Sequence, residues 1–438
     1  MTKMKAGFAE VDITPKLGTL KGGWWTYLPA KEIADPLFAR AAVFEGQGVC
    51  VGFIGLDVLS IRWSTVNEIR QGIESETGVS GKSIMVSATH NHAGPGLYKA
   101  VRVNPEQTEQ GKRYRSYQRD AELIESVVRK CRQAFCTAWA SRQEALLGYG
   151  HGFEFRVAHN RRVVMRNGTV KTHGTFKEPN ALYIEGPVDP EVGILAAKTP
   201  EGKLLGCLLD YTAHPTHHGG DHVISAGYPG VISRLLKERG YGICLYFNGA
   251  TGNVHTMDHR TQVDTTMDQA GTFLAETATK VLDSMAWSDN WPLHSEARTL
   301  QLPYRKISDE EICGKALGAQ RFVDSKIYDV ANPELVKRIR QRKVQPVEIQ
   351  AIHIGDAKFV GVPAEYFVEY GLQLKLAASP RRAYVVGHAN GMIGYVPTRE
   401  AFRRGGYETT FGPPFRMAPE AGEMILDAAI ELACHQGQ

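Results

Sequence analysis

Two histidines, His90 and His92, stand one residue apart where an apolar run ends and a glycine–proline turn begins. In an extended backbone, residues i and i+2 project to the same face, so both imidazoles can reach into one cavity. The turn at residues 94–96 then directs the chain away. Because neutral imidazole is a common metal ligand, the pair predicts a metal site. The alternative is a strand end whose histidines hydrogen-bond to their neighbours.

Three more residues of suitable chemistry follow in chain order. His214 stands where an expected strand over residues 203–209 ends and Pro215 prevents regular pairing. Glu365 comes just after an expected hairpin over residues 347–362, and Tyr395 lies in a glycine-flanked segment. Reactive groups favour strand-to-loop positions, because a rigid scaffold aims them while the loop leaves them accessible.

These residues lie in short segments that, taken in order, resemble the catalytic domain of the neutral, non-lysosomal ceramidase family. Ordered similarity over nearly the whole chain is hard to obtain by chance. The matching segments are residues 6–15, 39–44, 55–57, 87–96, 159–161, 188–191, 213–216, 224–230, 248–254, 362–365 and 394–398.

The resemblance implies one zinc ion per chain, held by His90, His214, Glu365 and Tyr395. Imidazole and carboxylate are standard zinc donors, and a cation favours the anionic form of a phenol. The resemblance places His92 close to the metal as a supporting or proton-transferring catalytic group. It also implies an α/β fold in which helices flank mixed β-sheets.

The chain departs from the family at the nucleophile. Family ceramidases carry a catalytic serine in a Gly-Asp-Val-Ser-type segment, and His255 occupies the corresponding position here. An imidazole cannot replace a hydroxyl in forming the usual acyl-enzyme, and Thr251 and Thr256 are offset from that position. The resemblance still implies that Arg161 contacts the substrate, and we expect Asn253 to bind substrate as well.

Attack by a metal-bound water fits this substitution, because the cation lowers the pKa of that water toward neutrality. His255 would act as general base, general acid or substrate ligand, since an unperturbed imidazole has a pKa of about 6.5. Its alternative role is that of a structural donor in a loop. We therefore predict a zinc-dependent hydrolase that acts on a soluble amide, ester or glycan-type substrate rather than on ceramide.

Two other functions stay open at this point. One is a metal-assisted carbohydrate lyase or glycosidase, in which a histidine or tyrosine moves the proton. The other is a catalytically inactive binding protein that keeps the metal for stability.

A histidine-rich run follows His214. We expect His217 and His218 to face the substrate. Either of them could instead bind a second metal together with Asp221 or His222, which would make the site binuclear.

The composition favours a soluble globular protein. The 438 residues are 43% hydrophobic and 22% charged, and no break in composition divides them. We expect a single domain over residues 1–438 that lacks the family's additional C-terminal β-sandwich domain. The N-terminus lacks a secretory apolar core, and the best apolar run, residues 49–59, is too short to span a bilayer. We expect a cytoplasmic location and no stable membrane insertion.

The cysteine usage and the net charge limit the kinds of partner that we expect. Seven scattered cysteines without a CxxC pair suit reduced thiols. The net charge of +4 is small for this length, and the sequence contains no recognisable nucleic-acid module, so we expect no nucleic-acid partner. The expected partner is a small-molecule substrate, with a homo-oligomer left open.

Alternating helices and strands must position these residues. Apolar spacing predicts helices over residues 63–73, 116–138 and 265–285. Strands are expected over residues 41–44, 49–56, 83–87, 203–209 and 243–247. His90, His214 and His255 follow the last three of these strands. Strands that end on a common sheet edge bring distant loops together, so we expect one shared cavity.

Overall fold

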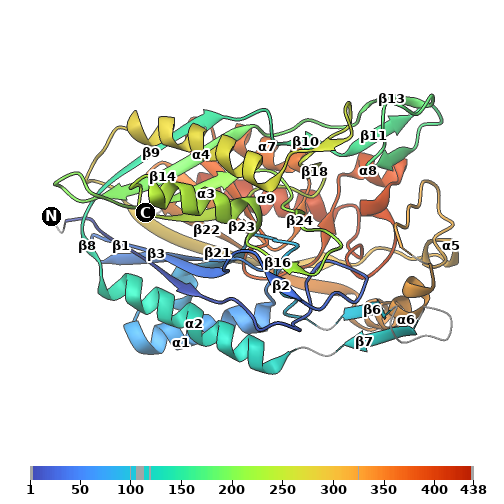
Figure 1. Cartoon of the computed structure of the whole chain (residues 1–438), viewed down its shortest axis with the longest axis horizontal. Helices are drawn as coiled ribbons and strands as arrows, with labels where there is room; N and C mark the ends of the chain where they lie inside the picture. The colour runs from blue at the N-terminus through green and yellow to red at the C-terminus, as the bar shows by residue number, and fades with distance from the viewer. Residues whose placement is uncertain (1–2, 99, 105–112, 118–119, 324, 436–438) are drawn as a thin grey trace.

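Three β-sheets of four or five strands form the framework of the molecule in the computed structural model (Figure 1). The structure describes residues 3–98, 100–104, 113–117, 120–323 and 325–435. The first sheet has the order β5 (Ile84–Ala88), β4 (Val49–Leu56), β3 (Phe38–Gly46), β1 (Lys5–Asp12), β8 (Gln143–Glu144). The second has the order β17 (Ile243–Asn248), β15 (Leu204–Tyr211), β14 (Glu191–Lys198), β9 (Leu146–Phe153). The third has the order β21 (Leu293–Pro303), β22 (Val344–Ile354), β23 (Ala357–Val362), β25 (Arg382–Gly387).

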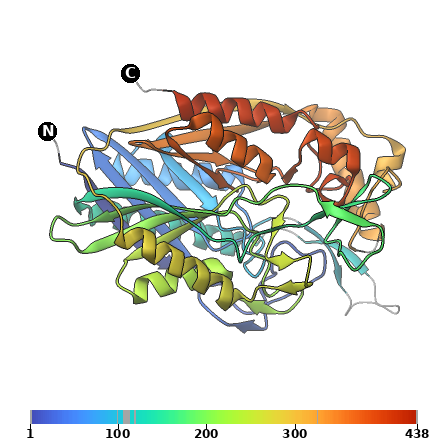
Figure 2. The same ribbon diagram turned by 90° about the horizontal axis from the view of Figure 1, so that it is seen from above.

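A pair of helices covers the outer face of each large sheet (Figures 1 and 2). Helices α1 (Trp63–Thr77) and α2 (Ala121–Ala140) pack on the first sheet, and their apolar faces join it in one buried cluster. The second sheet is covered by α3 (Gly227–Glu238) and α4 (Met267–Asp283), and the third by α7 (Val368–Ala378) and α9 (Ala421–Cys434). Each sheet thus buries one face under its helices and turns the other inward.

The inner faces of the three sheets meet in a common core. Each sheet contributes a phenylalanine to its centre: Phe53 from β4, Phe247 from β17 and Phe359 from β23. Their ring centroids lie 5.2–6.0 Å apart. Aromatic rings at this spacing pack favourably, and full burial of such side chains is a large apolar contribution. This contact fixes the three sheets relative to one another.

Smaller elements line the end of the sheets where the candidate residues gather. The small strands are β2 (Glu32–Ile33), β6 (Ala100–Asn104), β7 (Arg113–Tyr117), β10 (His159–Asn160), β11 (Arg162–Met165), β12 (Val170–Thr172), β13 (Ala181–Ile184), β16 (Val223–Ile224), β18 (Val254–His255), β19 (Met257–Asp258), β20 (Val263–Asp264), β24 (Glu365–Tyr366) and β26 (Tyr395–Val396). The remaining helices are α5 (Asp309–Ile312), α6 (Ser325–Arg342) and α8 (Arg399–Arg404). Most of these strands form two- or three-stranded pairings that hold the loops after the large sheets.

Each large sheet is mixed and contains one parallel pair of strands: β4 with β5, β15 with β17, and β23 with β25. Parallel strands end on the same side, so their carboxyl-end loops meet. The sequence predicted one common sheet edge for His90 and His214, but β5 and β15 belong to different sheets. Packing between sheets, rather than pairing within one, brings those loops together.

The predicted fold class, mixed sheets flanked by helices, is confirmed. The predicted strands and helices are present with shifted ends, and the largest shift is at the helix predicted to begin at residue 116. Helix α2 begins at Ala121, because the Asp120 carboxylate caps it by accepting from the Leu123 N–H. Residues 116–117 belong to β7, and residues 118–119 lie outside the described residues. Across the described ranges, every helix is too short or too polar to cross a bilayer.

Candidate active site

Three imidazoles converge at the carboxyl ends of β5 and β15. The Nε2 atoms of His90 and His214 are 3.0 Å apart, and His92 Nε2 lies 3.2 Å from the first and 3.0 Å from the second. His90 and His214 are buried, and His92 is half-buried. We call these three residues the histidine cluster.

The hydrogen bonds of His90 and His214 show which of their nitrogens carry protons. His90 Nδ1 lies 2.9 Å from the Leu59 carbonyl oxygen, and His214 Nδ1 lies 3.4 Å from that of Thr251. A carbonyl oxygen only accepts, so each Nδ1 is the donor and each Nε2 presents a lone pair. Two lone pairs therefore face each other at 3.0 Å.

Protonation of His214 does not relieve this contact. Burial, followed by the neighbouring His90 and Arg161, holds the pKa values of His92 and His214 well below the ordinary range. A cation at this point would satisfy the lone pairs of His90 and His214, and the Nε2 atom of His92 would join them in the tautomer that carries its proton on Nδ1. A tetrahedral zinc ion with bonds of about 2.05 Å sets its ligand atoms about 3.3 Å apart, close to the separations in the cluster. The donor set thus fits a divalent transition-metal ion.

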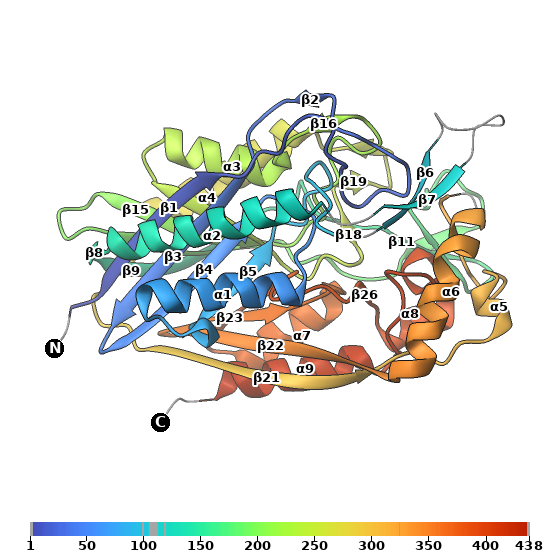
Figure 3. The same ribbon diagram turned by 90° about the horizontal axis from the view of Figure 1, so that it is seen from below.

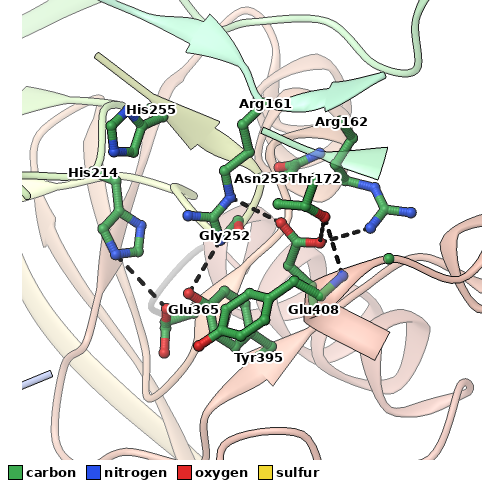
Figure 4. Close-up of polar contacts among 12 residues, drawn as sticks. Arg161, Arg162, Thr172, His214, Gly252, Asn253, His255, Glu365, Tyr395 and Glu408 are labelled. Carbon is green, nitrogen blue, oxygen red and sulfur yellow. Dashed lines mark hydrogen bonds and ion pairs between the residues drawn. The ribbon is translucent and has the colours of Figure 1, made fainter. Parts of the chain in front are cut away.

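Glu365 and Tyr395 approach the same point from β24 and β26. These two strands pair in parallel with Glu365 directly opposite Tyr395. Glu365 Oε2 lies 3.5 Å from His90 Nε2 and 3.9 Å from His214 Nε2, and the contact with His214 is drawn in Figure 4. The Tyr395 side chain hydrogen-bonds to Glu365. Burial raises the pKa of Tyr395 well above its usual value, and Arg161 opposes that shift. A metal ligand role for this phenol therefore requires a cation to favour its anionic form.

The segment before His255 approaches the histidine cluster closely. Gly252 donates its N–H to the Tyr366 carbonyl at 2.7 Å. A Cβ atom at Gly252 would lie 2.5 Å from the Glu365 carbonyl oxygen, which no real side chain could do without movement of the backbone. The glycine is needed here so that the loop after β17 can lie against Glu365.

Arg161, Arg162 and Glu408 form a buried group behind Tyr395, which we call the arginine–glutamate group (Figure 4). Glu408 Oε1 accepts from Arg161 Nε at 2.8 Å, and its Oε2 accepts from Arg162 at 2.7 Å and from the Thr172 hydroxyl at 2.7 Å. Burial alone would raise the pKa of Glu408, but the two guanidinium groups lower it to about 2. This carboxylate is ionised and fully bonded.

Arg161 connects this group to the histidine cluster. Its second terminal nitrogen donates to the Gly252 carbonyl at 2.7 Å and to the Tyr395 hydroxyl at 3.1 Å. Arg161 is 3% exposed. The structure shows Arg161 bonded to Tyr395, and its expected contact with substrate stays a prediction.

His255 lies beside the cluster on β18, which pairs with β10 so that His255 is opposite His159. Its Nδ1 accepts from the Met257 N–H at 3.0 Å, so its Nε2 carries the proton and donates to the Thr216 hydroxyl at 2.5 Å. Burial, then His173 and Arg161, holds the pKa of His255 well below its ordinary value. In this geometry His255 is a neutral donor and not a base for Thr216.

Other residues around His255 are committed to internal bonds. The Asn253 amide donates to both oxygens of Glu369, and its carbonyl accepts from the Val368 N–H. Asn253 is 0% exposed and holds the loop through these bonds, and its expected contact with substrate stays a prediction. The hydroxyls of Thr251 and Thr256 bond to Asn248 and Asp264.

The loop histidines point to separate partners. His217 Nε2 donates to the Thr265 carbonyl at 2.7 Å, His218 Nδ1 lies 2.9 Å from Asp221 Oδ2, and His222 Nδ1 donates to the Pro29 carbonyl at 2.7 Å. In the described ranges these residues belong to no group of three or more converging metal ligands, so the binuclear alternative gains no support. His217 remains close to His255, and it lowers the pKa of that residue.

Sequence reasoning missed three side chains at this site. His388, directly after β25, stacks on His90 with ring centroids 3.9 Å apart and planes 7° apart, and both residues have left-handed backbones. Such strain costs about 1–3 kcal/mol and gathers at functional sites. The strand-end criterion that found His214 would have found His388. No feature of the sequence around Thr216 or Glu408 marked either residue as part of the site in the same way.

Comparisons with known proteins agree with this architecture. No family model matches the sequence. A curated relative, neutral ceramidase from Pseudomonas aeruginosa, is 22% identical over 416 residues, in an alignment that covers 80% of this chain and 59% of the relative. The chain therefore spans less than two thirds of that protein's length.

Solved structures extend the likeness to the whole fold. A crystal structure of neutral ceramidase from Pseudomonas aeruginosa matches with a TM-score of 0.74 at 18% identity, covering 99% of this chain and 74% of that one. A ceramidase complexed with C2 matches with a TM-score of 0.72 at 17% identity, covering 99% of this chain and 75% of that one. The chain has a neutral ceramidase-like fold, and its sequence resembles that family.

Proposed function

We propose that this protein is a metal-dependent hydrolase, with zinc as the metal, that acts on a soluble amide, ester or glycan-type small molecule. The observation that carries the proposal is the histidine cluster, in which three Nε2 atoms converge within 3.2 Å of one another. Similarity in sequence and fold to neutral ceramidase supports a hydrolytic reaction. Residues 1–438 would act as one catalytic unit.

In this proposal His90, His92 and His214 would hold the metal, Glu365 and Tyr395 lie beside it as further candidate ligands, and one position stays open for water. A bound divalent cation polarises a substrate carbonyl and lowers the pKa of a coordinated water. The expected place of His92 thus changes from a neighbour of the metal to a ligand, because its Nε2 is as close to the other two as they are to each other. His388 would keep the plane of the His90 ring in place by stacking on it.

The arginine–glutamate group would position the phenol. Arg161 is anchored to Glu408 and Gly252, and it presents its remaining bond to the Tyr395 hydroxyl. A side chain held by several buried bonds keeps its direction during a reaction, and this preorganisation is a main source of catalytic stabilisation. Arg161 would therefore be a positioning residue.

Thr216 and His255 would bind the substrate. The Thr216 hydroxyl accepts from His255 Nε2, which leaves its own proton to be donated elsewhere. We assign that proton to a substrate oxygen, where charge develops when water adds to a carbonyl or when the leaving group departs. Of the roles open to His255, this geometry favours that of a donor.

A protein nucleophile is not needed in this scheme. His255 stands where family ceramidases carry serine, and the hydroxyls of Thr251 and Thr256 are bonded to buried neighbours. This difference argues against an acyl-enzyme and against ceramide as the natural substrate.

Turnover in ¹⁸O-labelled water tests the proposal. The purified protein, stripped with a chelator and reloaded with zinc, is incubated with panels of N-acyl compounds, esters and oligosaccharides. We expect zinc-dependent turnover with one labelled oxygen in the product. An unsaturated product without label would instead indicate a lyase. Zinc binding without turnover of any panel would indicate a binding protein.

A further inference from the structure

A second group of metal-ligand side chains lies far from the histidine cluster, where the last helix ends on the third sheet. His294 and Glu296 are two residues apart on β21, so both project from the same face of the strand. Helix α9 packs against β21 and runs along it toward the C-terminus (Figure 3). His435 directly follows α9, and its N–H bonds to the Glu431 carbonyl in the last turn.

We propose that His294, Glu296 and His435 bind a divalent transition-metal ion that fastens the end of α9 to β21. His435 Nδ1 lies 2.8 Å from Glu296 Oε2, and His294 Nε2 lies 3.8 Å from the same oxygen. The three ligand atoms all lie within 4.8 Å of one another. Small rotations of partly exposed side chains would bring them to the spacing of about 3.3 Å that tetrahedral zinc requires.

The hydrogen bonding of these atoms distinguishes the group from an ordinary surface ion pair. His294 Nε2 and Glu296 Oε2 are both shut off from solvent, and neither has a hydrogen-bond partner among the described residues. Glu296 Oε2 has an ion-pair contact with His435 Nδ1, whereas His294 Nε2 lies beside the same oxygen without a hydrogen bond. Buried polar atoms are normally paired, so His294 Nε2 calls for a partner that it can share with Glu296 and His435.

Neighbouring residues hold the group in place. His353 on β22 pairs directly with His294, and their rings lie 5.5 Å apart. His353 Nε2 donates to the Leu432 carbonyl at 3.0 Å, which ties the last turn of α9 to the sheet. Arg298, next on the same face of β21, pairs with Glu431 of α9. The two elements that supply the ligands are thus fixed relative to each other before any ion binds.

The second group is separate from the histidine cluster. It lies beside the turn between β22 and β23, since His294 pairs with His353 and His353 with Lys358. Glu365 follows the opposite end of β23. Six residues of extended strand, about 20 Å, separate the two ends. Two imidazoles with one carboxylate suit zinc and similar borderline ions rather than calcium or magnesium, which prefer oxygen ligands.

Calorimetric titration with zinc chloride tests this proposal on the full-length, chelator-stripped protein. We expect His294→Ala and Glu296→Gln each to lose one zinc ion per chain, or to bind it at least about tenfold more weakly, relative to the parent protein. His151→Ala is the matched control, since His151 is also an exposed histidine on a strand but belongs to neither group. This control keeps the parent stoichiometry.

Two further measurements make the outcome decisive. His214→Ala keeps the zinc ion of the second group, so a failure of the histidine cluster to bind metal leaves this result unchanged. Zinc raises the thermal unfolding midpoint of His214→Ala, and the additional His294→Ala substitution removes that shift. Equal zinc stoichiometry and affinity in the parent, His294→Ala and Glu296→Gln proteins would overturn the proposal. Circular dichroism of the metal-free variants verifies that they fold.

Discussion

The arginine–glutamate group is connected to the histidine cluster through Tyr395 and Glu365, yet the two groups satisfy their polar atoms in opposite ways. In the arginine–glutamate group both oxygens of Glu408 accept hydrogen bonds from charged donors. In the histidine cluster the Nε2 atoms of His90 and His214 present lone pairs to each other at 3.0 Å. Both groups are largely buried.

This difference indicates that the arginine–glutamate group holds the structure in place, whereas the histidine cluster is suited to bind a ligand. A buried network in which every member is bonded rigidifies its surroundings, whereas buried lone pairs without a donor are costly. The fold accepts that cost at the histidine cluster, together with a left-handed backbone at His90. We infer that binding of a ligand offsets this free-energy cost. Substitutions in the two groups should therefore have different effects on metal content, activity and stability.

The largest expected effect comes from His214→Ala. Loss of one of three converging imidazoles should remove one metal ion per chain and lower kcat/KM by about 10³-fold or more, because a metal supplies several kcal/mol of stabilisation. Elemental analysis and kinetics on the substrate found in the labelled-water experiment measure both. His222→Ala, in the same loop but bonded to Pro29, is the control. Unchanged metal content in His214→Ala would contradict the comparison.

Glu408→Gln should affect stability first. Removing the charge between two buried guanidinium groups should lower the free energy of unfolding by about 3–5 kcal/mol. The folded pKa of Glu408, about 2, is below its unfolded value near 4.5, so its contribution is present above pH 4.5 and is lost as the pH falls toward 2. Urea unfolding at several pH values should show this acid dependence in the parent protein and a reduced one in Glu408→Gln.

Arg161→Lys should lower activity without removing the metal, which distinguishes the roles of the two groups. Lysine keeps the charge near Glu408 but cannot also bond Gly252 and Tyr395, so we expect kcat/KM to fall about 10- to 100-fold while metal content persists. The matched control is Arg162→Lys, which disturbs the same carboxylate without a bond to Tyr395. Similar losses of kcat/KM in both variants would show that Arg161 acts only through stability.

The smallest effect is expected for His255→Gln, and it decides the role of His255. A glutamine amide can still donate to Thr216, so a donor role predicts a loss of kcat/KM below about tenfold, whereas loss of a general base costs about 10²- to 10⁴-fold. Because the pKa of His255 is held well below 6.5, the pH–rate profile should not move. A large loss accompanied by a missing acidic limb would restore the base role.

Much of the candidate site could be predicted from sequence, because its residues follow strands whose patterns are clear. His90, His214, Glu365 and Tyr395 were found in this way and through the family resemblance, and the structure brings all four together. The contacts of Asn253 could not be predicted, for a physical reason. Its neighbour His255 faces the site, but the amide of Asn253 points to Glu369, 116 residues away in the chain.

Glu408 could not be predicted, since nothing near it in sequence marks a carboxylate that pairs with a guanidinium 247 residues earlier. His388 could have been found by its position after β25, but its stacking on His90 depends on how the first and third sheets pack.

The amino-acid sequence by itself determined which elements form and which donor types follow them, because helix and strand periodicity and turn residues act over a few positions. The tertiary structure alone decided which nitrogen of His90 and of His214 is a donor and which presents a lone pair. That choice depends on carbonyls such as those of Leu59 and Thr251, which reach the histidines only after the three sheets have packed around Phe53, Phe247 and Phe359.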